Sequence, residues 1–403
     1  MTLRVAVLHQ GFIPPYRVRF YELLNQRAGA EYVVFHGAPP SDTGSLAATG
    51  PFSFPNRPVR NREIRIGRWA AIYQPVLRDV LSGGFDAVVL GHEIKFLSNL
   101  ALAALCGPRD TAVLFWGFGY HVKIGLDLGS EAQGWVTASA GFIKDRLVRL
   151  ADGYLAYTNG GVDRLCAIGF PRDHIYVLRN TIDVTEQIKL YDQFKAADPL
   201  ALRRELGLLP DSVVLMFIGR LLEPRRADLL IEAARRINEG GLCPSFVEAI
   251  VIGSGPMADS LRRQGEGVPG VRLLGDIRDQ SLIAKYMKVA AAVVIPGLAN
   301  LAVNHAFAQG RPVITRQHDQ HGPEVEYIVD GGNGLIVGGG VDEFVDALAR
   351  FAASPEQQRR LTEGTLETRK SLRMEMMAER FDEAVRDTVD RKRAADARKR
   401  TAA

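Results

Sequence analysis

The sequence predicts an α/β protein made of two Rossmann-like domains that face each other across a cleft. Short apolar runs alternate with longer helical patterns, and this alternation occurs once on each side of a polar stretch near residue 200. Nearly all the runs are continuously apolar, which is typical of parallel strands covered by helices on both faces. Because doubly wound sheets bind ligands at the carboxyl ends of their strands, we expect the ligand site in the cleft.

The apolar runs that we expect to form strands fall into two sets. They cover residues 4–9, 31–36, 85–91, 111–117, 153–158 and 175–180 in the first half, and 212–219, 247–253, 271–275, 291–296, 311–315 and 334–337 in the second. The segment between the sets is polar and contains Pro199 and Pro210, so we expect an N-terminal domain over 1–200 and a C-terminal domain over 201–373. The last long helix, about 374–393 within a basic tail region 374–403, has no sheet of its own. We expect it to pack back on the N-terminal domain.

Composition excludes several classes of protein. The chain has 403 residues, of which 47% are hydrophobic and 24% charged, with a formal net charge of +4. These values exclude a largely disordered or fibrous chain and indicate no nucleic-acid partner. Cys106, Cys166 and Cys243 lack the spacing of a zinc site or a disulfide framework, which fits a reducing cytoplasm. The N-terminal apolar run is too short for a signal peptide, and no run of about 20 apolar residues predicts a transmembrane helix.

Residues 217–234, "FIGRLLEPRRADLLIEAA", place arginines between the end of a buried strand and the start of a helix. This junction is an anion site in doubly wound sheets, because backbone N–H groups and the helix dipole point toward it. Gly219 lets the backbone turn closely, and the guanidiniums of Arg220 and Arg225 can bracket a diphosphate with bidentate hydrogen bonds. The spacing alone also fits arginines on a surface loop, so further motifs are needed to decide.

A glycine cluster follows in "VIGSGPMADSL", where Gly253, Gly255 and Ala258 match the dinucleotide-binding fingerprint. Asp276 lies near the place of a ribose-binding acid, so a nicotinamide-dependent enzyme is an alternative. Against it, the fingerprint belongs to the first strand–helix turn of its domain, and here it follows the second predicted strand.

The motifs of the second half resemble, in order, those of glycosyltransferase family 4. Its members are retaining, nucleotide-sugar-dependent enzymes with the two-Rossmann GT-B fold. The resemblance covers about residues 212–340. The arginine segment is similar to the family's Gly-Arg-Leu…Lys-Gly segment, with Arg225 at the lysine position, and "VIGSGPMADSLRR" is similar to its Gly-x-Gly-Pro strand end. "VRLLGDIRDQSLIAKYMKVAAAVVIPG", "HAFAQGRPVI" and "GPEVEYIVDGGNGLIV" resemble the family's base-binding segment, donor-loop helix and following turn and strand.

The resemblance implies a nucleoside-diphosphate sugar as co-substrate, with no cofactor and no metal, and the sequence contains no Asp-x-Asp motif. Arg220 and Arg225 would hold the donor diphosphate and stabilise its charge as the sugar leaves. The donor-binding positions that it implies are Gly219, Gly253, Gly255, Gly275, Ile277, Gly297, Leu298, Asn300, Leu301, His305 and Glu324.

One departure from the family concerns a pair of glutamates eight positions apart. Here "PGLANLAVNHAFAQG" has Gly297 at the first position and His305 at the second. Gly297 is expected to open space beside the donor sugar. A neutral ring nitrogen of His305 can hydrogen-bond a ribose hydroxyl, and Asn300 can cap the helix that carries it. Glu324 either contacts the sugar or caps a local helix.

The first half resembles the acceptor-binding side of the family. His121 takes the position of a family histidine near the donor sugar, and it is our third catalytic candidate. Trp116 and Tyr120 would offer stacking surfaces to sugar rings. Arg17 either reaches the diphosphate or an acidic acceptor, or faces solvent. The acceptor-side and loop candidates are Gly11, Arg17, His92, Trp116 and Tyr120.

The predicted activity is transfer of a hexosyl or other glycosyl group, with retention, from a nucleotide sugar to a hydroxyl of a glycan, glycolipid or small molecule. Surface polysaccharide or glycolipid biosynthesis is the expected context. A nucleotide-sugar epimerase on the same scaffold and a non-catalytic nucleotide- or glycan-binding protein are the alternatives. The expected location is the cytoplasm. The basic amphipathic segment "GFIKDRLVRLADG" adds the hypothesis of peripheral contact with the inner membrane.

Overall fold

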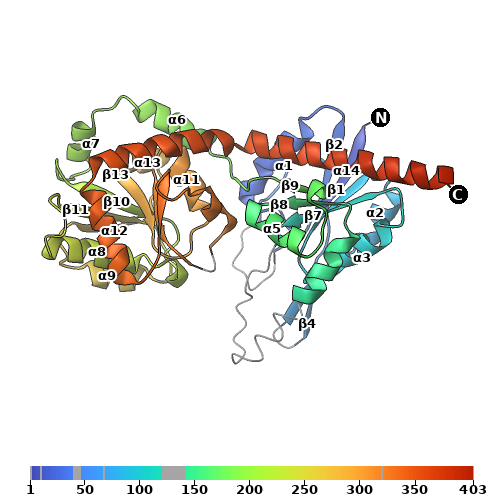
Figure 1. Cartoon of the computed structure of the whole chain (residues 1–403), viewed down its shortest axis with the longest axis horizontal. Coiled ribbons are helices and arrows are strands. Elements are labelled where there is room, and N and C mark those ends of the chain that lie inside the picture. Colours follow the sequence, from blue (N-terminus) through green and yellow to red (C-terminus); the bar gives the residue numbers. More distant parts are fainter. Residues whose placement is uncertain are drawn as a thin grey trace. The chain divides into compact units, whose positions relative to one another are not determined.

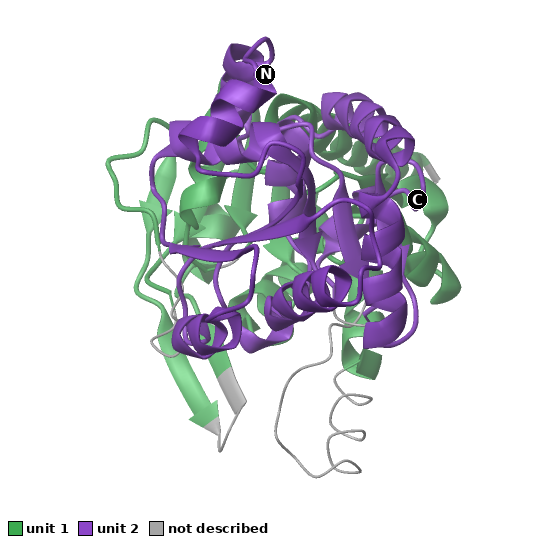
Figure 2. Cartoon of the chain, turned by 90° about the vertical axis from the view of Figure 1, so that its left-hand side faces the viewer, with its two compact units in different colours: residues 1–182, 374–403 green, residues 183–373 purple. Residues whose placement is uncertain are grey.

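The computed structural model describes residues 2–9, 11–39, 47–66, 69–119, 141–318 and 321–402. The chain forms two compact units (Figure 2). Unit 1 contains residues 1–182 and 374–403, and unit 2 contains residues 183–373. Each unit is built on a parallel sheet, as the continuous apolar runs predict.

Unit 1 contains a seven-stranded sheet in the order β3-β2-β1-β6-β7-β8-β9, and all its strand pairs are parallel. Its strands are β1 (Leu3–Leu8), β2 (Ala30–His36), β3 (Asn56–Pro58), β6 (Ala87–Gly91), β7 (Ala112–Gly117), β8 (Gly153–Ala156) and β9 (Ile175–Val177). Its helices include α1 (Val18–Asn25), α2 (Leu77–Ser82), α3 (Leu97–Cys106), α5 (Asn159–Ala167) and α14 (Met374–Ala402). Val5 and Val7 of β1 pack into one apolar cluster, and Ala6 and Leu8 pack into another. Both faces of the sheet are therefore covered, which explains the uninterrupted apolar runs.

Two features of unit 1 are absent from the sequence prediction. β3 is a short edge strand of mostly exposed residues, and β4 (Arg62–Ile66) pairs with β5 (Trp69–Tyr73) in a separate antiparallel hairpin. Neither β3 nor β4 carries a buried apolar run, so periodicity gave no signal for them.

Unit 2 contains a six-stranded parallel sheet in the order β12-β11-β10-β13-β14-β15. Its strands are β10 (Val213–Ile218), β11 (Val247–Ile252), β12 (Val271–Gly275), β13 (Ala290–Ile295), β14 (Val313–Arg316) and β15 (Gly334–Val337). Its helices are α6 (Thr185–Phe194), α7 (Pro199–Glu205), α8 (Asp228–Glu239), α9 (Ala258–Gly265), α10 (Gln280–Val289), α11 (Ala302–Ala308), α12 (Val341–Ala352) and α13 (Pro355–Thr368). This strand order reverses direction between β10 and β13, which is the point where doubly wound sheets bind ligands.

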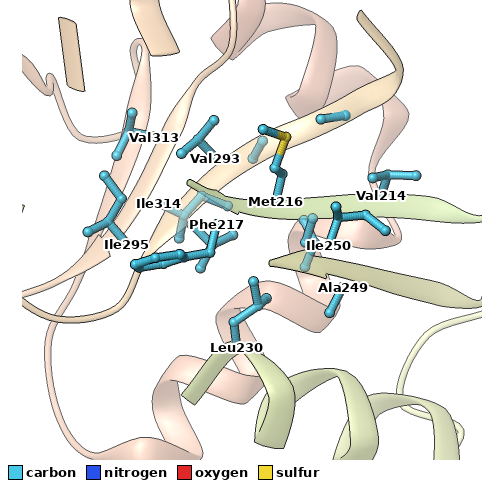
Figure 3. Packing of buried hydrophobic residues seen from close by; sticks show 14 of the residues in the cluster. Val214, Met216, Phe217, Leu230, Ala249, Ile250, Val293, Ile295, Val313 and Ile314 are labelled. Carbon is cyan, nitrogen blue, oxygen red and sulfur yellow. The ribbon is translucent and has the colours of Figure 1, made fainter. Parts of the chain in front are cut away.

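The core of unit 2 is apolar and buried. Met216 and Phe217 of β10 pack with Ile250 of β11 and with Leu230 of α8 in one continuous cluster (Figure 3). Because these strands are closely packed, their ends are held in fixed positions, and so are the turns that follow them.

The boundary between the units differs from the predicted one at residue 200. Contacts divide the chain between residues 182 and 183, because α6 packs against α10 and α11, and α7 packs against α10. These helices therefore belong to unit 2, although the segment is polar enough to suggest a linker.

The last helix, α14, belongs to unit 1, where it packs against α1, β7, β8 and β9 (Figure 1). Phe381 is fully buried and makes ring contacts with Phe20, Tyr32 and Trp116, at centroid distances of 5.2–5.9 Å. The expectation that this helix packs back on the first domain is confirmed. It runs from Met374 to Ala402, further than the predicted end near residue 393.

Candidate active site

The candidate site of unit 2 begins where β10, β11 and β12 end side by side. The N–H of Gly219 donates to Ile252 O at 3.0 Å, and the N–H of Gly253 donates to Gly275 O at 2.8 Å. Gly219 and Gly253 have φ of +140° and +146°, and a Cβ on Gly253 would lie 1.8 Å from Gly219 O. A Cβ on Gly255 would lie 2.5 Å from Leu221 O. These glycines let adjacent strand ends touch backbone to backbone beside the Arg220 turn.

Arg225 folds back over the end of β10. It ends the short 3-10 helix η4 (Glu223–Arg225), and its Nη1 would lie 2.8 Å from a Cβ on Gly219. Burial lowers the pKa of Arg225, and the charge of neighbouring Arg220 lowers it further. The Arg225 Nε is buried without a hydrogen-bond partner among the described residues. Arg220 and Arg225 therefore interact electrostatically at the end of β10, where the sheet order reverses.

The third arginine of the segment has a structural role. Arg226 adopts a left-handed backbone with φ of +53° and binds the carboxylate of Asp228, with Nη2 and Oδ2 2.7 Å apart. Over the part of the chain that the structure describes, no carboxylate forms an ion pair with Arg220 or Arg225. Two cations that lack a counter-ion beside a strand end form a site for an anion.

Gly297 follows β13 and binds the Arg225 turn directly. Its N–H donates to Arg225 O at 3.0 Å, and the N–H of Leu298 donates to Pro224 O at 2.8 Å. A Cβ on Gly297 would lie 2.1 Å from Pro224 O. The expectation that Gly297 opens space beside the sugar is therefore wrong, because backbone atoms of residues 224 and 225 fill that position.

His321 holds the next residue of the same loop. Its Nδ1 accepts from the N–H of Ala299 at 3.0 Å, and its Nε2 lies 2.8 Å from Arg316 O, to which it donates. Burial lowers the pKa of His321, the hydrogen bond to Arg316 opposes this shift, and nearby His318 adds to it. The imidazole is therefore neutral with its proton on Nε2, as assigned from its two partners. Sequence reasoning missed this residue, and its only signal was a histidine placed just before the Gly322–Pro323 turn.

The remaining donor-side candidates surround the same loop. Asn300 Oδ1 accepts from the N–H of Ala302 at 3.3 Å, but the N-cap of α11 is Leu301, so Asn300 lies one residue before the predicted cap position. Leu301 immediately precedes that helix, and His305 lies half-buried on it, where burial lowers its pKa. Glu324 is only 2% exposed, and its Oε2 would lie 2.6 Å from a Cβ on Gly322, beside the backbone of Asn300.

The base-side candidates lie at the end of β12. Gly275 has φ of +71°, with no atom of another residue within 4 Å of an added Cβ, and Ile277 packs against the core of unit 2. Asp276 forms an exposed ion pair with Arg278 at 3.3 Å. Asp276, the residue that would bind a ribose in a nicotinamide-dependent enzyme, is thus already paired with an arginine of its own loop.

Two acceptor-side predictions are corrected in unit 1. Arg17 is 1% exposed, so it neither reaches a ligand nor faces solvent. Its guanidinium donates to Asn180 Oδ1 and, at 3.4 Å, to Thr181 O, and it lies over the Trp116 ring at 5.2 Å. Trp116 is also 1% exposed, and His9 stacks on it at 3.7 Å, so its ring cannot stack on a sugar.

His92 and Gly11 serve the framework of unit 1. His92 is buried, with Nδ1 3.0 Å from the Tyr154 hydroxyl and Nε2 3.1 Å from Lys144 O. Gly11 has φ of +77°, and its carbonyl accepts from the N–H of Gly37 and from the side chain of Asn61. Tyr120 and His121 lie outside the described residues.

Comparison with known proteins supports the interpretation of unit 2. Residues 212–354 match the family model of glycosyl transferases group 1. The D-inositol 3-phosphate glycosyltransferase of Kribbella flavida is 27% identical over 59% of this chain and 56% of its own length. The alpha-D-kanosaminyltransferase of Streptomyces kanamyceticus is 28% identical over 43% of this chain and 45% of its own length. The chain thus spans about half the length of the curated relatives it matches.

Solved structures of low sequence identity share the fold. Anabaena Alr3699/HepE in complex with UDP has a TM-score of 0.64 and 16% identity, covering 96% of this chain and 100% of that one. Sucrose-phosphate synthase from Thermosynechococcus elongatus has a TM-score of 0.63 and 16% identity, covering 96% and 98%. These likenesses confirm the predicted fold, two α/β domains with parallel sheets of the GT-B type. Within the described residues, no helix is long and apolar enough to cross a bilayer, and no cluster of side chains has a metal-ligand composition.

Proposed function

We propose that this protein is a retaining glycosyltransferase that moves a sugar from a nucleoside-diphosphate donor to a hydroxyl acceptor without a metal ion. The observation that carries the proposal is the pair Arg220 and Arg225, two neighbouring guanidiniums at the reversal point of the unit 2 sheet with no ion-paired carboxylate among the described residues. The match of residues 212–354 to glycosyl transferases group 1 supports it, as do structural neighbours crystallised with UDP and with UDP-glucose.

The chemistry follows from where charge develops. When the bond from the anomeric carbon to the diphosphate oxygen breaks, negative charge grows on the leaving diphosphate. Arg220 and Arg225 donate hydrogen bonds to that charge, and partial burial of Arg225 strengthens its electrostatic effect. His305, neutral because of its burial, binds a ribose hydroxyl, and Glu324 takes the sugar contact that the missing first glutamate makes in the family.

The biological context that we propose is assembly of a surface polysaccharide or glycolipid in the cytoplasm, with peripheral contact to the inner membrane. Phe142 and Ile143, on a helical segment of unit 1, are 61% and 50% exposed, and Arg146 and Arg149 lie exposed beside them. Apolar side chains flanked by cations suit an anionic lipid surface. Co-sedimentation with phosphatidylglycerol vesicles tests this contact, and binding that survives the double substitution Phe142→Ser and Ile143→Ser would contradict it.

The activity is tested by incubating the full chain with UDP-, GDP- and ADP-sugars, with and without acceptor hydroxyls, in the presence of a metal chelator. Slow hydrolysis of one donor with release of the nucleoside diphosphate supports a transferase. An altered sugar that stays attached to the nucleotide indicates an epimerase. Binding without any chemical change indicates a non-catalytic protein, and either of these outcomes refutes the proposal.

A further inference from the structure

The loop after β13 connects the arginine turn to the end of β14 through a chain of hydrogen bonds. At one end, Gly297 and Leu298 donate to Arg225 O and Pro224 O. At the other end, Ala299 is held on both sides: its N–H donates to His321 Nδ1 at 3.0 Å, and its carbonyl accepts from the N–H of Gly322 at 2.7 Å. In all these hydrogen bonds, residues 297–299 take part through backbone atoms only.

Among the described residues, two side chains link this loop to β14: the Thr315 hydroxyl, which lies 3.5 Å from Gly297 O, and the imidazole of His321, which binds Ala299. The imidazole accepts on one edge from Ala299 and donates on the other to Arg316 O, the last residue of β14. A strand end inside a packed sheet is a rigid anchor. The imidazole therefore transmits the position of β14 to the loop, and the loop transmits it to the backbone that carries Arg225.

We infer that His321 is a positioning residue for the diphosphate site, which it serves by holding the Gly297–Ala299 loop against the Arg225 turn. The inference rests on the proposed function, because it assigns to His321, which lies outside the diphosphate site, a role in forming that site. His321 touches neither guanidinium, so its effect on a bound diphosphate passes through Arg225. Removal of its Nδ1 acceptor leaves the N–H of Ala299 unpaired, so Ala299 keeps the hydrogen bond from Gly322 but loses its link to Arg316 O at the end of β14.

Steric fit explains why the loop needs a clamp from this side. A Cβ on Gly297 would lie 2.1 Å from Pro224 O and 2.8 Å from Arg225 C, so the loop and the turn are in direct backbone contact. Such contact fixes Arg225 only while the loop itself is fixed. The Thr315 hydroxyl donates to Ile295 O at 2.7 Å and lies 3.5 Å from Gly297 O, so it secures the preceding strand end more firmly than the loop.

A double-mutant cycle on the full chain tests the inference. Binding of UDP, GDP and ADP is measured by calorimetry, and the tightest of them is used as the probe. His321→Leu is expected to weaken binding about tenfold, since a buried donor loses its partner, which corresponds to about 1.4 kcal/mol. In an Arg225→Ala background the same substitution is expected to change binding less than about twofold, because coupled residues are non-additive. Lys370→Leu, at an exposed position of unit 2, is the control and should bind as the wild type does.

Rescue and tautomer measurements separate positioning from a general effect on folding. His321→Asn keeps an acceptor near the place of Nδ1 and should recover binding to within about threefold of the wild type, because one hydrogen bond of the two is retained. In protein labelled with ¹⁵N-histidine, His321 should show the neutral tautomer with the proton on Nε2. That measurement also applies if His321→Leu fails to fold.

Several outcomes would overturn the inference. They are wild-type binding by His321→Leu, fully additive effects of the substitutions at positions 321 and 225, or a proton on Nδ1 at neutral pH. If the wild-type protein binds none of the nucleoside diphosphates, the proposed function fails, and the tautomer measurement still decides whether the clamp exists.

Discussion

The contact between Gly297 and the Arg225 turn makes a quantitative prediction for Gly297→Ala. The added Cβ would lie 2.1 Å from Pro224 O, whereas an ordinary contact requires at least 3.4 Å, so the loop and the turn must separate by about 1 Å. Separation stretches the hydrogen bonds that Gly297 and Leu298 donate, now 3.0 and 2.8 Å long. Overpacking and weakened hydrogen bonds together should lower the free energy of unfolding by about 2–4 kcal/mol.

For a domain the size of unit 2, that loss corresponds to a fall in the unfolding midpoint of roughly 5–15 °C by calorimetry. Turnover should fall by up to about a hundredfold, because the displaced turn carries Arg225. Gly338→Ala is the matched control, since its Cβ would meet only Gln317 Oε1, at 3.5 Å, and its stability should stay within about 0.5 kcal/mol of the wild type. If Gly297→Ala melts and turns over like that control, the docking described above is wrong. Gly297→Glu, which restores the carboxylate of the family pattern, should inactivate the protein further.

Three more predictions concern separate parts of the molecule. Arg220→Ala should lower turnover at least about a hundredfold without changing the unfolding midpoint. Arg278→Ala, which changes an exposed arginine in the same unit, should leave turnover unchanged. An active Arg220→Ala variant would refute the role of Arg220 in binding the diphosphate. The pKa of His321 is lowered in the folded state, so the folded state binds fewer protons than the unfolded one near that pKa. The contribution of His321 to the stability of unit 2 should therefore be complete above the ordinary pKa of 6.5 and be lost as the pH falls below that value. A His321→Asn variant with the same pH dependence of stability would contradict this. Phe381→Ala should destabilise unit 1 by about 3–5 kcal/mol, which urea unfolding followed by tryptophan fluorescence measures; a loss below about 1 kcal/mol would show that α14 is weakly held.

The sheets were predictable because strands buried on both faces have continuously apolar sequences. Each predicted apolar run overlaps a strand, and the place of Arg220 and Arg225 after β10 followed from the strand–helix junction that contains them. Edge strand β3 and hairpin β4–β5 were not predicted, because β3 and β4 contain no continuous apolar run. The polar helices α6 and α7 resembled a linker because their partners, α10 and α11, come much later in the chain.

The errors concern residues whose surroundings are set by distant segments. The partners of Arg17 are Asn180, Thr181 and Met377, and no local pattern predicts a buried arginine with such partners. Trp116 ends a strand at the expected edge, but the residue that covers its face, His9, comes from another strand end. Spacing locates a strand end without giving the direction of its last side chain.

The same dependence on distant segments governs how the chain folds. Unit 2 is one continuous stretch, whereas unit 1 is completed only by α14, whose Phe381 and Val385 lie in its core. During synthesis the core of unit 1 is therefore complete only after α14 has been made, whereas unit 2 contains its whole core in one continuous stretch. We therefore expect unit 2 to be able to complete its fold before unit 1 does, whereas N-terminal domains generally fold first.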